Sequence, residues 1–99
     1  MDEMNKNEQL KEAELEEVSG GFNPQQHGLH GTDMGCEYHN GIWCYKYKVG
    51  SGDNLSTICY AYRGNGTEAF YSRVASFNGI NNPNWINVGQ IIFIPTGNF

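Results

Sequence analysis

Histidines and cysteines gather ahead of the aromatic-rich half of the chain, and these residue types can hold a metal ion. His27 and His30 are separated by two residues, as are Cys36 and His39, and Cys44 follows. Such pairs resemble the ligand pairs of zinc sites. The gaps between the pairs, however, match no zinc module that we recognise. We therefore expect solvated histidines and no metal or other cofactor, with a metal-binding arm as the alternative.

The three cysteines, Cys36, Cys44 and Cys59, leave at least one thiol unpaired in a monomer. Their number therefore does not define a disulfide scaffold. In an oxidising compartment Cys36 can close a small loop with Cys44, or Cys44 can reach Cys59. The sequence does not choose between these pairings.

Carboxylates are too sparse in residues 45–95 for hydrolytic chemistry. A glycosidase needs two carboxyl groups flanking the scissile bond, and Asp53 and Glu68 are the only acids in this segment. Asp53 fits a helix cap, and Glu68 fits a first helical turn, where acids are favoured. The segment also lacks histidine, so it holds no Ser-His-Asp or Cys-His arrangement. We therefore expect a protein that is not an enzyme.

Charge divides the chain into two unequal parts. Residues 1–21 carry seven acids against two lysines, a net charge of −5, whereas residues 22–99 are formally neutral. Without a cationic face, nucleic acid is not an expected partner. The 99 residues suffice for one small domain and an arm, and no stretch has the apolar length of a membrane span.

Composition predicts three segments followed by a short tail, 96–99. Residues 5–18 are strong helix formers that end at Ser19-Gly20-Gly21, which predicts a helix within segment 1–21. This start lacks the basic and apolar regions of an ordinary secretory signal. In residues 22–44 the apolar residues follow neither a helical nor a strand period, and glycines are frequent. We therefore expect an irregular arm.

Residues 45–95 carry the signals of regular structure. Tyr45, Tyr47 and Val49 alternate with lysines, as in a half-buried strand. Asp53 or Asn54 can cap a following helix, which has apolar residues at Leu55, Ile58, Cys59 and Tyr62 and ends at Gly64.

A second helix and a second strand complete this segment. Thr67 is a good cap for a helix with Phe70, Val74 and Phe77 on one stripe, and Asn78-Gly79 would stop it. A short apolar run, 91–95, then predicts a strand closed by proline. The expected fold class is α+β, a small βααβ module in which both helices cover one face of a two-stranded antiparallel sheet.

Three ordered segments carry a family resemblance. YKVGSGDNLSTI, ASFNGINNPNWINVGQ and IIFIP resemble the opening, middle and close of a LysM domain. The resemblance covers about half the chain and implies a module that binds N-acetylglucosamine polymers of the cell wall, either peptidoglycan or chitin. The chain departs from the family at Asn54, where Thr or Ser is usual, and at Cys59, where a small residue is common.

The resemblance also implies a shallow groove between two loops as the binding site. The matched positions are Gly52, Asp53, Asn54 and Leu55 in the first loop and Asn78, Gly79 and Ile80 in the second. An N-acetyl group offers one N–H, one C=O and one methyl, which backbone groups and an aliphatic wall can satisfy. Each position also has a structural explanation: Asp53 as helix cap, Gly79 as helix stop, Leu55 and Ile80 as core. Trp85 is interpreted as core-capping, with sugar stacking as the alternative.

The first 21 residues resemble the double-glycine leaders of exported bacterial peptides. The matching positions are Leu10, Leu15, Val18, Gly20 and Gly21. The resemblance implies recognition by a peptidase-containing ABC transporter and cleavage after Gly21. It further implies a cytoplasmic precursor and a product that is secreted or associated with the cell wall.

The leader resemblance also raises a second function class, a bacteriocin or modified peptide precursor. Thr32 and Cys36 would then be candidates for thioether formation. We rank this class below glycan binding because a folded module follows the leader.

Overall fold

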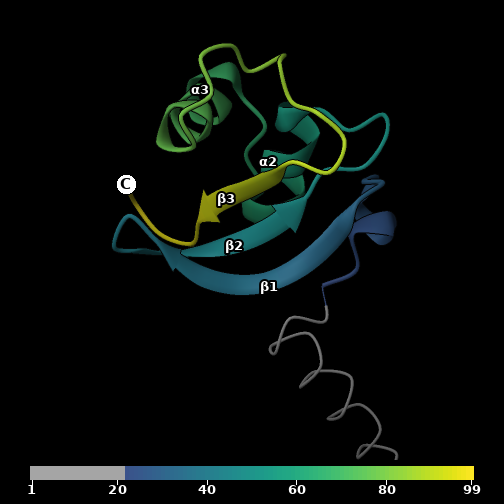
Figure 1. Cartoon of the computed structure of the whole chain (residues 1–99), viewed down its shortest axis with the longest axis horizontal. Helices are drawn as coiled ribbons and strands as arrows, with labels where there is room; N and C mark the ends of the chain where they lie inside the picture. The colour runs from purple at the N-terminus through teal and green to yellow at the C-terminus, as the bar shows by residue number, and fades with distance from the viewer. Residues whose placement is uncertain (1–21) are drawn as a thin grey trace, which may run out of the picture.

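The computed structural model describes residues 22–99, and the expected leader helix lies outside this range. The sheet has three strands. Figure 1 shows that it is curved and that the α-helices lie on one side of it. The strand order is β1-β2-β3. In chain order the elements are η1 (Pro24–His27), β1 (Thr32–His39), β2 (Ile42–Lys48), α2 (Leu55–Arg63), α3 (Glu68–Phe77) and β3 (Ile91–Pro95).

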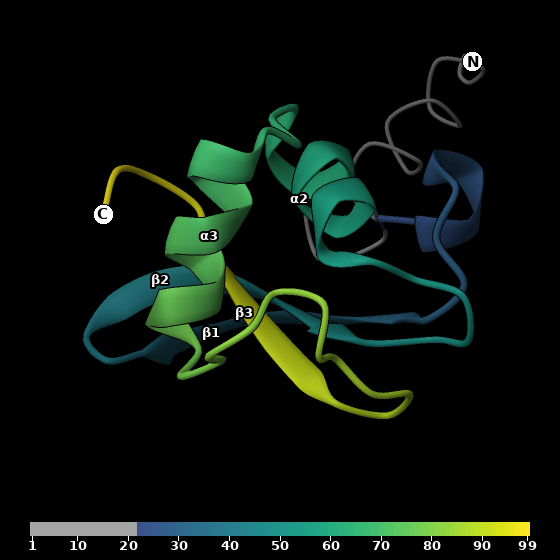
Figure 2. The ribbon, with the colours of Figure 1, turned by 90° about the horizontal axis from the view of Figure 1, so that it is seen from above.

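The expected βααβ module is present and consists of β2, α2, α3 and β3. β2 and β3 pair antiparallel, with Tyr47 opposite Ile92. Both helices lie over the same face of the sheet, as the two views agree (Figure 2). The predicted fold class is confirmed, and β2 begins earlier than expected, at Ile42 instead of Tyr45.

Local capping residues define both α-helices. Asn54 is the N-cap of α2, where its Oδ1 accepts the N–H of Thr57 at 2.9 Å, and Gly64 ends the helix in the left-handed region. Thr67 caps α3, and Asn78 follows its last turn. An N-cap of this kind stabilises a helix by about 1 kcal/mol. Asn54, and not Asp53, therefore has the capping role that the sequence left open.

The core lies between the two helices and the strands β2 and β3. Its fully buried side chains include Tyr47, Leu55, Ile58, Val74, Ile92 and Ile94. Leu29, from the arm, is 1% exposed and belongs to the same cluster. Within residues 22–99, none of the helices is long and apolar enough to cross a membrane.

The expectation of an irregular arm is wrong for residues 32–39, which form β1. This strand pairs antiparallel with β2, and Asn40-Gly41 makes the two-residue turn between His39 and Ile42. Both turn residues have positive φ, 53° and 79°, the combination that such hairpin turns require. The ladder shifts register between Asp33 and Cys36, at a bulge that interrupts the alternation of side chains. A search of the sequence for regularly alternating apolar and polar residues therefore misses β1.

The start of the arm also packs tightly on the module. Gly31 and Gly50 lie so close to the neighbouring backbone that neither could carry a side chain. A Cβ on Gly50 would lie 2.1 Å from the His30 carbonyl oxygen, and one on Gly31 would lie 2.0 Å from the Lys48 carbonyl oxygen. Residues 29–31 are therefore part of the folded unit and not a separate tail.

Candidate functional site

Asp53 organises the loop between β2 and α2. Its carboxylate accepts the backbone N–H of Gly50 and of His30, each at 2.8 Å, and the hydroxyl of Tyr47 donates to it. Burial, together with the hydrogen bond to Asp53, raises the pKa of Tyr47 above its usual range. Tyr47 in turn accepts the N–H of Gly31 at 2.7 Å. Asp53 thus joins the loop, β2 and the arm.

The other predicted residues of the first loop differ in accessibility. Gly52 and Asn54 are exposed, and the Asn54 side chain holds both the N–H and the hydroxyl of Thr57. Leu55 is 2% exposed and packs in the core. The His30 ring lies beside Gly52, with its Cδ2 3.6 Å from the position of a Cβ there. The exposed surface of this loop is therefore formed by Ser51, Gly52 and Asn54, with His30 beside it.

The second loop begins with Asn78, whose side chain is fully used by the fold. Its Nδ2 donates to the carbonyls of Val74 and Phe93 at 2.7 and 2.8 Å, and its Oδ1 accepts the N–H of Phe93 at 2.7 Å. Gly79 is exposed and Ile80 is half-buried against the core. Gly79 and Ile80 thus present backbone and aliphatic surface, whereas Asn78 holds α3 against β3.

Trp85 lies farther along the same loop and is 69% exposed, so the interpretation as a core-capping residue is wrong. It sits in a turn in which its N–H donates to the Asn82 carbonyl at 2.8 Å and the N–H of Asn84 donates to the Asn82 side chain at 2.9 Å. After the Asn82-Pro83-Asn84 turn Trp85 is exposed, whereas the next residue, Ile86, packs against the core. Those turn residues are the sequence signal for the exposure of Trp85.

The two loops meet at their bases. The N–H of Val49 donates to the Gln90 carbonyl at 2.9 Å, and the N–H of Gly89 donates to the Val49 carbonyl at 2.8 Å. Figure 1 shows the loop after β2 beside the connection from α3 to β3. The structure thus joins the start of the loop after β2 to the end of the α3–β3 connection, and these hydrogen bonds involve none of the predicted site positions.

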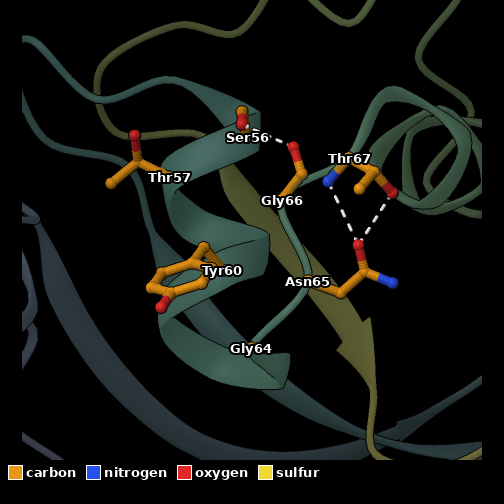
Figure 3. Close-up of a pocket in the computed structure, with 7 residues that line it drawn as sticks. All are labelled: Ser56, Thr57, Tyr60, Gly64, Asn65, Gly66 and Thr67. Carbon is orange, nitrogen blue, oxygen red and sulfur yellow. Dashed lines mark hydrogen bonds between the residues drawn. The ribbon is translucent and has the colours of Figure 1, made fainter.

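A separate open pocket of about 530 Å³ lies between α2 and the loop that joins it to α3 (Figure 3). The predicted site residues do not line it. The Ser56 hydroxyl donates to the Gly66 carbonyl at 2.7 Å, and Asn65 accepts both the N–H and the hydroxyl of Thr67. The hydrogen bonds of these side chains therefore support the loop, and the exposed Tyr60 ring forms one wall.

The β1–β2 hairpin does not gather the cysteines and histidines of the arm, residues 22–44, into one cluster. All three cysteines are free thiols, with Cys36 exposed and Cys44 and Cys59 buried. Burial raises the pKa of Cys59 to about 12. His39 stacks on Phe93 at 4.1 Å between ring centroids. Within residues 22–99, no three histidine, cysteine or acidic side chains gather into a potential metal site.

Comparison with known proteins gives one family. Residues 47–95 match the LysM domain, a segment that contains both loops described above. No curated protein and no solved structure matches the chain. LysM is a carbohydrate-binding, non-catalytic domain that binds glycans containing N-acetylglucosamine. Residues 47–95 of this chain are therefore a LysM domain.

Proposed function

We propose that this protein is exported and binds N-acetylglucosamine polymers of the cell wall, without catalysis, through the loops after β2 and after α3. The observation that carries the proposal is the LysM match over residues 47–95. The hydrogen bonds of Val49 with Gly89 and Gln90, which join the two loops, support it. Peptidoglycan and chitin share the acetamido group that these loops would recognise.

The exposed groups of the two loops suit an acetamido sugar. Gly52 and Gly79 let a ligand approach the main chain, whose N–H and C=O groups complement those of an N-acetyl group. Half-buried Ile80 offers an aliphatic contact for the methyl group. Exposed Trp85 adds a ring that can stack on a sugar face. We propose that Asn54 and these four residues contact the ligand and that Asp53, Leu55 and Asn78 hold the loops in place.

The proposed export uses residues 1–21 as a double-glycine leader that is cut after Gly21. Leu10, Leu15 and Val18 would form the apolar face gripped by the peptidase domain of an ABC transporter, with Gly20 and Gly21 entering its cleft. The support comes from the sequence resemblance. Mass spectrometry of the culture medium tests it, because the secreted product must begin at Phe22.

The glycan proposal is tested by co-sedimentation with insoluble peptidoglycan and insoluble chitin. The two tryptophans make a matched pair, because Trp85 lies on the second loop whereas Trp43 lies on β2, where its ring contacts that of Tyr38 on β1. Trp85→Ala should weaken retention about tenfold, as expected for the loss of one stacked ring worth about 1.5 kcal/mol. Trp43→Ala should bind like the unsubstituted protein.

Two results would contradict this proposal. Absence of retention of the folded protein on both polymers would exclude glycan binding. Equal binding losses in Trp85→Ala and Trp43→Ala would place the contact outside the two loops. A single domain offers a small contact area, so the experiment should use polymer in excess.

A further inference from the structure

Asp33, on β1, has a buried carboxylate oxygen that the fold leaves unused. Its Oδ1 accepts the hydroxyl of Tyr62 at 2.6 Å. Its Oδ2 is buried and, in the described part of the chain, has no hydrogen-bond partner. A buried carboxylate oxygen without a donor is destabilising, so natural proteins rarely keep one without a use. The position is suited to a donor, above all a charged one.

Asp33 lines a cavity of about 380 Å³, between the start of η1 and the start of β1. The side-chain amide of Gln25 donates to the Gly31 carbonyl at 2.8 Å and links the two walls. Phe22 is the first residue after the proposed cleavage site, and it lines the same cavity as Asp33. The full lining is Phe22, Asn23, Pro24, Gln25, Gly31, Thr32 and Asp33.

Aromatic contacts hold Phe22 at this cavity. Its ring lies 4.4 Å from the ring of Tyr62 and stacks on the ring of His27 at 4.5 Å, between centroids. Tyr62 therefore contacts Phe22 with its ring and Asp33 with its hydroxyl. These contacts hold the residue that would become the N-terminus at the cavity that Asp33 also lines.

We propose that the α-ammonium group created at Phe22 by leader removal binds Asp33 in this cavity. The proposal rests on the leader part of the proposed function. Hydrolysis of the Gly21–Phe22 peptide bond by the peptidase consumes one water and leaves a carboxylate on Gly21 and an ammonium on Phe22. In the precursor the same nitrogen is an uncharged amide, so the ion pair exists only after cleavage. Leader removal then stabilises the folded domain.

The pairing has a defined pH window. A free α-amino group has a pKa of about 7.7 to 8.0, and the adjacent carboxylate favours its charged form, so the folded-state pKa is raised. While Asp33 is ionised, the stabilisation is therefore complete below about pH 7.7, and it is lost as the pH rises through the folded-state pKa of the α-amino group. Tyr62 and Cys36 are the titratable groups that interact with Asp33, and Tyr47 lies opposite it on β2; burial raises the pKa of each. These three groups stay uncharged through most of this window. His27 contacts Phe22, so a His27 variant is needed as a control.

The test compares the thermal midpoints of the full chain, residues 22–99 with a free N-terminus, and residues 22–99 with an acetylated N-terminus. The identified core cluster lies within residues 22–99, so this segment contains what it needs to fold. At pH 6.5 the free form should melt about 4 to 8 °C above the acetylated form and above the full chain. The difference should shrink as the pH approaches 10. It should vanish in Asp33→Asn and persist in His27→Gln.

Equal midpoints for the free and acetylated forms would overturn the proposal. If Asp33→Asn fails to fold, the α-amino group of Phe22 is titrated by NMR in residues 22–99 without substitution. An α-amino pKa of about 8 or below would overturn the proposal. A secreted product that begins elsewhere than Phe22 also overturns it. Loss of glycan retention would instead contradict the glycan proposal alone.

Discussion

Asp53 shows how one side chain can look like a ligand contact in the sequence and act as a structural anchor in the fold. Its carboxylate accepts hydrogen bonds from Gly50, His30 and Tyr47. Two of these donors are near in sequence, whereas His30 comes from the arm. The sequence shows the first two as neighbours but gives no sign of the third, because the contact forms only after the arm folds back.

Replacing Asp53 should therefore affect stability more than ligand chemistry. Asp53→Ala should lower the free energy of unfolding by about 3 kcal/mol, because it leaves a buried hydroxyl and two N–H groups without their charged acceptor. Urea unfolding measures the change. Glu68→Ala is the matched control, since Glu68 is an exposed acid in the first turn of α3 and should cost below about 1 kcal/mol. Equal losses in the two variants would contradict the anchoring role.

Buried phenol and thiol groups predict alkaline unfolding. Burial, then the hydrogen bond to Asp33, raises the pKa of Tyr62, and burial raises that of Cys59 to about 12. In the unfolded chain these groups ionise near pH 10 and pH 8.5. The stability that these two groups contribute is therefore complete below about pH 8.5 and falls as the pH rises toward 12, because the unfolded state releases its protons first.

Urea unfolding at pH 8 and pH 11 tests this prediction, with Cys59→Ala as the variant. The substitution lowers stability at both values by removing core volume, but it should reduce the loss between pH 8 and pH 11. An unchanged difference between the two pH values would show that Cys59 does not contribute.

Among the helices and strands, the sequence predicts best those whose determining residues lie within their own segment. α2 and α3 were predictable because apolar periodicity and cap residues lie within each segment. β1 was not, because its bulge breaks the alternation and much of its surface is exposed. The Asn40-Gly41 pair was the available signal, since its flanking residues are the ends of paired strands.

The hairpin turn gives a direct test of this element. Gly41 has a φ of 79°, in the left-handed region, and the site has room for a side chain. Gly41→Ala should therefore cost about 1 kcal/mol through backbone strain alone. Gly97→Ala is the control, because Gly97 also has open space but not a left-handed backbone. A thermal midpoint for Gly41→Ala equal to that of the control would contradict the turn geometry.

At the scale of the whole molecule, the LysM match begins inside the folded unit. Residues 47–95 match the family, yet Leu29 fills part of the core and Asp33 binds the hydroxyl of Tyr62. The pairing of β1 with β2 adds a third strand. The arm is thus an integral extension of the domain, which composition alone could not indicate.

Removing the arm should expose this dependence. A fragment of residues 45–99 should unfold at a lower temperature than residues 22–99, because burial of Leu29 alone is worth roughly 1.5 to 3 kcal/mol. The fragment also loses the hydrogen bonds that His30, Gly31 and Asp33 make with the module. Differential scanning calorimetry measures the change. Indistinguishable midpoints would show that the arm is dispensable.

Asn78 has a consequence for how copies of this protein can associate. Its amide bonds to both the N–H and the carbonyl of Phe93, at the outer edge of β3. It therefore occupies the two backbone groups through which a foreign strand would add there. Edge-to-edge pairing with another strand is therefore blocked at the middle of β3, an edge strand of the sheet.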